Sequence, residues 1–229
     1  MKISKNIKRD VRGFTLNFCA IVLGIVITFW GQSIVDKNHE LDDVKSSLHV
    51  VRDEMLANLE DLKACADGMD IECEAAVYLN SNLDGPMDGN KIDTLLTYAQ
   101  IVTDESHMVL PHDALDLVRS NGIFAKMDNK ELPLKIITAY ALFDRWSREH
   151  DAVQSKAQRL LEELFKTRGL KDFQNEEKQI RLGAVLTTEY GQEIIRTYML
   201  RDGSKLRQSL PQIEETIAAI DEFIGEDCQ

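Results

Sequence analysis

An uninterrupted uncharged stretch near the N-terminus, Gly13 to Val35, constrains this chain more than any other feature. Its sequence, GFTLNFCAIVLGIVITFWGQSIV, contains no Asp, Glu, Lys, Arg or His in 23 consecutive positions. A helix of that length rises about 34 Å at roughly 1.5 Å per residue, which is enough to cross a bilayer core of about 30 Å. The stretch therefore predicts a single transmembrane helix.

The charges on either side of this stretch predict its orientation. Five basic residues and one acid, Asp10, precede it: Lys2, Lys5, Lys8, Arg9 and Arg12. Lys and Arg concentrate on the cytoplasmic side of a span, so the N-terminus is expected inside and the remainder outside. We divide the chain into a basic cytoplasmic tail (1–12), a transmembrane signal anchor (13–35) and an extracytoplasmic domain (36–229), held at a bacterial inner membrane. Trp30 is expected to anchor the span at its outer interface.

Two other interpretations of the stretch compete with an anchor. In a cleaved signal peptide, Gly31 and Ser33 would form the small-residue cleavage site. However, the apolar run 14–29 is about 16 residues long, slightly above the usual range of about 7–15, and Trp30 crowds the site. A buried core helix is disfavoured because no other segment is apolar enough to surround it. We therefore expect an uncleaved anchor.

Small and weakly polar residues recur along one side of the predicted anchor, with spacings of three or four. Such a stripe lets two membrane helices approach closely and predicts association of this span with another helix. Small residues are also common in spans that stay alone. The stripe consists of Asn17, Ala20, Gly24, Thr28 and Gly31.

An amphipathic repeat follows the anchor and predicts one long helix that continues it as a stalk. The spacings are typical of a heptad seam with one local irregularity. The seam packs either on the later helices of the chain or on a second copy, and periodicity does not separate these alternatives. Its members are Leu41, Val44, Leu48, Val51, Met55, Leu59, Leu62, Ala66, Met69, Cys73 and Ala76.

The rest of the chain alternates helical patterns with turn formers. Turn residues at 84–90 end the stalk, and helices are expected at 91–102, 113–121, 128–167, 175–187, 189–200 and 204–224, the last kinked or restarted at Pro211. Gly122 is expected to terminate one helix, and Asp128 with Glu131 to begin the next. Runs of period two are nearly absent. The predicted fold is all-α: a transmembrane helix that continues into a long amphipathic helix, packed with later helices as an extracytoplasmic bundle.

Charge and cysteine content limit the partners of the exported region. The whole chain carries −12 and residues 1–12 carry +4, so residues 36–229 carry −16. Such an acidic region would be repelled by nucleic acid. Cys65 and Cys73 would lie about 12 Å apart on one helix, too far for a disulfide. The disulfide states of Cys65, Cys73 and Cys228 stay open at this point.

Several packing and capping patterns resemble a known family. They are Phe18-x3-Val22-x-Gly24-Ile25-Val26-Ile27 leading to Trp30, the acidic heptads around Glu40-Leu41 and Asn58-Leu59, Leu115-x2-Val118-Arg119-Ser120-Asn121-Gly122, and Met127-x-Asn129-x-Glu131-Leu132 before a helix with Tyr140. Together they resemble an uncharacterised family of short bacterial single-pass membrane proteins with an N-terminal anchor and a helical extracytoplasmic region. The resemblance implies the same topology and no known activity or catalytic residues.

Residues that could carry chemistry are few. His107 and His112 lie among acids and could form a metal or acid/base site, although a polar loop with unrelated side chains is the simpler interpretation. No catalytic or phosphate-binding motif occurs, and we expect no catalytic residues, metal or cofactor. Tyr140, Phe143 and Trp146 are either core residues or, if Trp146 is accessible, a partner-binding patch.

These observations favour a non-enzymatic, membrane-anchored interaction or scaffold module that binds proteins or copies of itself. The alternative is an extracytoplasmic ligand sensor that works through a partner membrane protein. An enzyme with a site near His107 and His112 is the minor alternative. The sequence identifies neither the partner nor the ligand.

Overall fold

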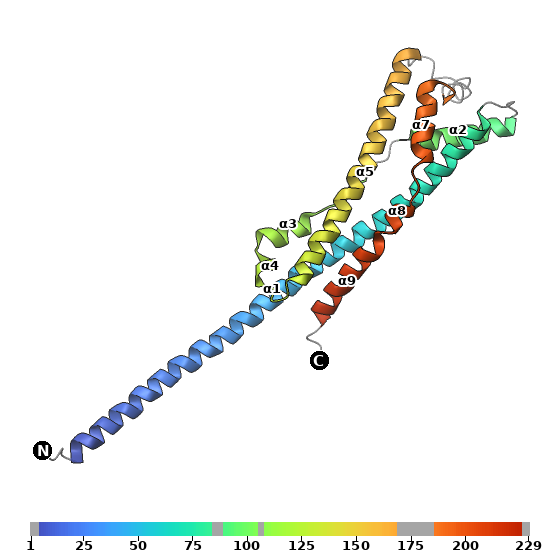
Figure 1. Cartoon of the computed structure of the whole chain (residues 1–229). Coiled ribbons are helices and arrows are strands. Elements are labelled where there is room, and N and C mark those ends of the chain that lie inside the picture. Colours follow the sequence, from blue (N-terminus) through green and yellow to red (C-terminus); the bar gives the residue numbers. More distant parts are fainter. Residues whose placement is uncertain (1–4, 84–88, 105–107, 169–185, 226–229) are drawn as a thin grey trace.

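The computed structural model describes residues 5–83, 89–104, 108–168 and 186–225, and only the backbone of residues 5–21, 31, 33–35, 89, 90, 92 and 164–168. All regular structure in these ranges is helical, as predicted. The longest element, α1 (Lys5–Asn82), runs through the whole molecule, and its N-terminal part projects from the bundle as a lone helix (Figure 1). The stalk predicted to continue the N-terminal helix is confirmed.

Within the described residues, seven further helices are arranged along the C-terminal half of α1, in which the buried residues begin at Val44. Four of them precede residue 169: α2 (Gly89–Thr103), α3 (Asp113–Ser120), α4 (Ile123–Lys126) and α5 (Glu131–Arg168). The remaining described helices are α7 (Glu189–Met199), α8 (Ser204–Arg207) and α9 (Leu210–Gly225). Figure 1 shows α5 and α9 lying along the middle of α1, with α2 and α7 at its far end.

The seam of α1 is buried by the later helices of the same chain. From Val44 to Met69 its members are at most 8% exposed, and they share a core with residues of α3, α5 and α9 such as Leu115, Ile136 and Ile213. The structure therefore gives the intramolecular arrangement of the two that periodicity left open. Leu41, at the edge of the bundle, is exposed.

The apolar interior forms two separate cores. The proximal core, nearer the projecting N-terminal helix, is built by α1 up to Met69, the first half of α5, and α3, α4, α8 and α9. The distal core joins α1 from Ala75 to α2, the later part of α5, and α7. Polar side chains, Glu72 and Arg201 among them, lie between the two cores.

Most helix ends agree with the turn residues that predicted them. Gly122, directly after the C-cap of α3, has a φ of 65°, a conformation that glycine adopts without the penalty a Cβ would bring. The last helical segment restarts at Leu210, with Pro211 in the first turn where its missing N–H costs no hydrogen bond. The helix predicted over 175–187 lies largely outside the described residues.

One predicted helix start is wrong in detail. We expected Asp128 to cap the long helix, with Glu131 three residues later. The helix begins at Glu131, and Asn129 provides the capping oxygen by accepting a 2.8 Å hydrogen bond from the Glu131 backbone N–H. A short helix, α4, had not been predicted and precedes this turn.

Among the described residues, no helix is both long and apolar enough to cross a membrane. The anchor predicted over 13–35 therefore has no support from this observation and stays a prediction. Residues 13–21, 31 and 33–35 of that stretch lie outside the described side chains. From Val22 to Trp30, every described side chain on this helix is exposed.

Candidate functional site

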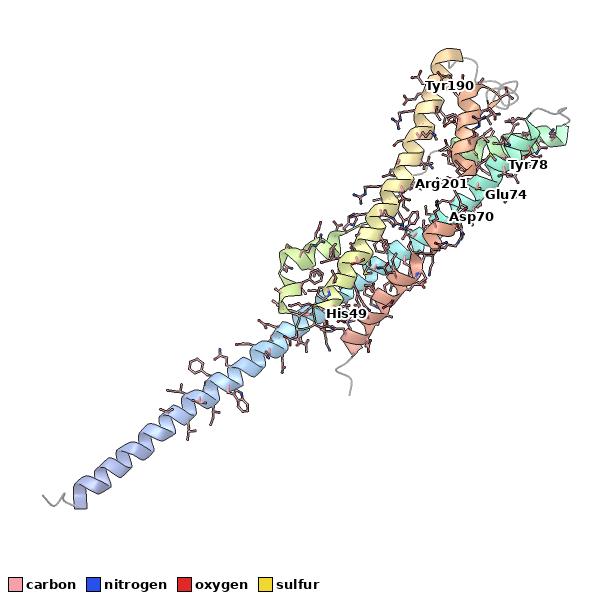
Figure 2. The ribbon with its side chains drawn as sticks, viewed as in Figure 1. His49, Asp70, Glu74, Tyr78, Tyr190 and Arg201 are labelled. Atoms are coloured by element: carbon pink, nitrogen blue, oxygen red, sulfur yellow. The ribbon has the colours of Figure 1, made fainter. Side chains whose placement is uncertain are left out.

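A cluster of polar residues fills the space between the two cores, and we call it the polar junction. Its members come from three separate parts of the chain, namely α1, α5 and the end of α7 with the turn after it. They are Cys65, Glu72, His150, Gln154, Tyr198 and Arg201. Figure 2 labels Arg201 near the point where α5 and α1 diverge, with Asp70 and Glu74 on neighbouring turns of α1.

Arg201 is the centre of the polar junction. Its guanidinium donates from Nη1 to Glu72 Oε2 and from Nη2 to His150 Nδ1, both at 2.5 Å. The side chains of Arg201 and Glu72 are only 6% and 14% exposed. Removing one member of such a buried pair would leave an uncompensated charge, at a cost of roughly 3–5 kcal/mol. Arg201 therefore ties α1 and α5 together through charge-assisted hydrogen bonds.

The hydrogen bond from Arg201 determines the protonation state of His150. A guanidinium can only donate, so His150 Nδ1 must be an acceptor and the ring proton must lie on Nε2. Cys65 Sγ lies 3.5 Å from the same Nδ1. Because this nitrogen accepts, the imidazole at the polar junction is neutral, and since its single lone pair already accepts from Arg201, Cys65 makes only a weak contact with it.

Burial raises the pKa values of three groups in the polar junction. Desolvation raises the pKa of Glu72, and the nearby Arg201 only partly offsets this. Desolvation also raises the pKa of the Cys65 thiol, more than Arg201 lowers it. The pKa of Tyr198 rises to about 12, chiefly through burial, and its hydroxyl donates to Gln154 Oε1. Cys65 is thus a protonated thiol beside a neutral imidazole, which differs from the thiolate and imidazolium of cysteine nucleophiles.

A second set of contacts fixes the turn that carries Arg201. The Gly203 N–H donates to Asp70 Oδ1 at 2.8 Å, and Arg207 bonds Asp70 and Asp67 at 2.7 and 2.6 Å. A Cβ on Gly203 would lie 2.3 Å from the Ala66 carbonyl oxygen, so only glycine permits this approach to α1. The turn therefore holds Arg201 between α1 and α5.

The residues predicted to carry chemistry are not gathered at the polar junction. His112 pairs with Asp144 at 3.2 Å at a half-exposed position, and His107 lies outside the described residues. Within the described part of the chain, no group of three or more His, Cys, Asp or Glu side chains could hold a metal ion. Cys65 and Cys73, predicted to be too far apart to pair, are free cysteines.

The proposed aromatic patch is instead part of the proximal core. Tyr140, Phe143 and Trp146 are at most 5% exposed. The Tyr140 hydroxyl donates to Glu54 at 2.5 Å, and Trp146 Nε1 donates to Ser209 Oγ at 2.8 Å. Of the two alternatives left open for these aromatic residues, the structure gives the core, because residues of α8 and α9 pack over this face of α5 despite the charges around Trp146 in sequence.

The predicted membrane stripe is described only in part. Thr28 Oγ1 donates to the Gly24 carbonyl at 2.8 Å, and a Cβ on Gly24 would meet nothing within 4 Å. Trp30 is 72% exposed. Asn17, Ala20 and Gly31 lie outside the described side chains, so association through this stripe stays a prediction.

The sequence contained one signal for the polar junction that we had not used. On α5 the buried face repeats at Phe143, Trp146, His150, Gln154 and Ala157, with spacings of three and four. Two polar residues on an otherwise apolar face predict a polar partner across the interface. Their partners, Arg201 for His150 and Tyr198 for Gln154, lie 51 and 44 residues later, where no local pattern points to them.

Comparisons with known proteins add no family to this geometry. No family model, curated protein or solved structure matches the chain.

Proposed function

We propose that this chain is a membrane-anchored helical module that binds other proteins or copies of itself and does not catalyse a reaction. The observation that carries the proposal is the helix that projects from the bundle. Between Val22 and Trp30 it exposes seven large apolar side chains, each at least 41% accessible. A helix that is apolar on all sides needs an apolar environment, and a bilayer would supply one. The anchor would leave residues 1–12 in the cytoplasm and the bundle outside, at a bacterial inner membrane.

Two apolar side chains on the bundle are candidate positions for contact with a partner. Leu200 and Val109 are 88% and 79% exposed, the highest values among the large apolar residues that the structure describes. Leu200 directly precedes Arg201, and Val109 lies between the buried residues Met108 and Leu110. Contiguous exposed apolar patches mark interaction sites, whereas single exposed side chains are common on any domain, so Leu200 and Val109 are the positions at which crosslinking tests for a partner.

Membrane fractionation tests the anchor. A charge near the middle of a span costs about 2.5–3.5 kcal/mol, so the double variant Leu23→Lys, Ile27→Lys should leave the carbonate-washed membrane pellet. The matched control, Val50→Lys with Ile71→Lys, changes two exposed apolar residues of α1 within the bundle and should stay in the pellet. Equal partitioning of the two double variants would contradict the anchor.

Site-specific crosslinking tests the interaction role. A photoreactive side chain at Leu200 should give a discrete adduct in intact cells, whereas the same group at the exposed Asp53 should not. Absence of an adduct at both Leu200 and Val109 would contradict this part of the proposal.

The polar junction favours a second candidate function, ligand sensing. Buried charges between two apolar cores lower stability unless they are fully paired, and such groups often mark binding sites. In this alternative the bundle would bind a small molecule, and a partner membrane protein would relay the signal.

A further inference from the structure

Two adjoining cavities lie on either side of the polar junction. The larger has a volume of about 510 Å³ and the smaller about 260 Å³. Both are bounded by Cys65, Met69 and His150, so these three side chains form the wall that the cavities share. A volume of this size accommodates a small molecule.

The wall of the larger cavity carries carboxylates on one part and apolar side chains, chiefly methionines, on another. Its carboxylates are Asp61 and Glu72, and its apolar wall includes Met69, Met108 and the exposed Val109. Among the residues that the structure describes, the other ionisable groups on this wall are His150, which is neutral, and the Cys65 thiol. The Glu72 charge is balanced by Arg201, which bonds its Oε2 atom, whereas Asp61 adds a further negative charge.

We propose that the larger cavity binds a small organic cation, an alkylammonium with a short apolar body. The ammonium group would lie toward Glu72 and Asp61, and its carbon chain would contact Met69 and Met108. A carboxylate ligand fits less well, because Arg201 already donates to Glu72 and His150 while two carboxylates face the cavity. The inference deepens the ligand-sensing candidate and does not require that α1 spans a membrane.

Cys65 provides a built-in reporter for this cavity. Methanethiosulfonate reagents react with a thiolate: the new disulfide forms at the sulfenyl sulfur, methanesulfinate leaves, and the thiol proton passes to solvent. We would use the full chain in detergent with Cys19, Cys73 and Cys228 each changed to Ala. We would measure the rate at which Cys65 is labelled by the cationic 2-aminoethyl reagent and by the anionic 2-sulfonatoethyl reagent. Each labelling rate would be divided by the rate at which the same reagent reacts with free 2-mercaptoethanol, which removes differences in intrinsic reactivity.

The expected result is a preference for the cation of about tenfold or more, which corresponds to roughly 1.4 kcal/mol. Asp61→Asn should reduce this preference severalfold while leaving the Glu72–Arg201 pair intact. Asp53→Asn, an exposed acid of α1 that is not part of the cavity wall, is the matched control and should not change it. n-Butylammonium should slow labelling by the uncharged methyl reagent, whereas butyrate should not.

Three results with the labelling reagents would overturn the proposal. They are equal normalised rates for cation and anion, a preference that Asp61→Asn leaves intact, and a Cys65 that no reagent modifies in the folded protein. Protection by butyrate rather than n-butylammonium would assign the cavity to an anion and would overturn it too. The membrane fractionation above has an independent outcome, so failure of one proposal does not decide the other.

Discussion

Two glycines near the polar junction differ in what a methyl group would meet. A Cβ on Gly203 would lie 2.3 Å from the Ala66 carbonyl oxygen, whereas a Cβ on Gly68 in α1 would meet nothing within 4 Å. Gly203→Ala should therefore lower the free energy of unfolding by about 1–3 kcal/mol, because backbone must move. Gly68→Ala is the matched control and should raise it by up to about 1 kcal/mol through helix propensity. Urea unfolding measures both, and a neutral Gly203→Ala would contradict the tight contact between the turn and α1.

Asp70 makes the stability contributed by the same turn dependent on pH. Hydrogen bonds from the Gly203 N–H and from Arg207 hold its pKa below the ordinary value of 3.8. A lowered carboxyl pKa stabilises the fold above pH 3.8, and that stabilisation is lost as the pH falls through the lower folded-state value. The melting temperature of Asp70→Asn should thus fall below wild type at neutral pH, by no more than about 4 °C because the site is exposed. The difference should close below pH 3.8, and one that widens in acid would contradict this role.

At the scale of elements, sequence patterns predicted the buried helix faces, which follow from periodicity, and the helix ends, which follow from local turn residues. The seam from Val44 to Met69 identified the buried face of α1, and Gly122 marked the end of α3. Periodicity records that a face is apolar and not which surface covers it. The intramolecular packing of the seam, and the covering of Trp146 by the C-terminal helices, therefore required the three-dimensional arrangement.

The candidate site was less predictable than the helices that carry it. Glu72, His150 and Arg201 come from α1, α5 and the turn after α7, and each stands alone in sequence as an ordinary charged or polar residue. Of the residues in the polar junction, only His150 and Gln154 could be recognised from the sequence, as polar residues on the apolar face of α5. The junction depends on the turn that Gly203 and Asp70 hold against α1, a long-range contact that no short sequence motif encodes.

At the scale of the whole molecule, the bundle is held by two cores with charged groups between them. The proximal core joins α5 and α9 to α1, and the distal core joins α2, α5 and α7 to it. Arg201 connects the α1 and α5 sides between these cores. Because α1 and α5 contribute to both cores, the polar junction lies where the ligand sensor proposed above would have to change their relative position.

The same architecture predicts that the stalk is not a parallel dimerisation element. In a parallel coiled coil the two copies of Cys73 would face each other and could form a disulfide in an oxidising compartment. In the bundle, Cys73 Sγ instead lies 3.5 Å from the Met199 carbonyl oxygen on α7, and desolvation raises the pKa of its thiol. With Cys19, Cys65 and Cys228 each changed to Ala, the protein should therefore run mainly as a monomer on non-reducing gels.

Alkylation rates supply the control for this last prediction. In the folded protein Cys73 should react with iodoacetamide more slowly than a cysteine introduced by Glu74→Cys in a Cys73→Ala background, because Glu74 is exposed on the adjacent position of α1. Unfolding in urea should make the two rates similar. A dominant disulfide-linked dimer through Cys73 would mean that two copies share the seam, and the later helices would then have to leave α1.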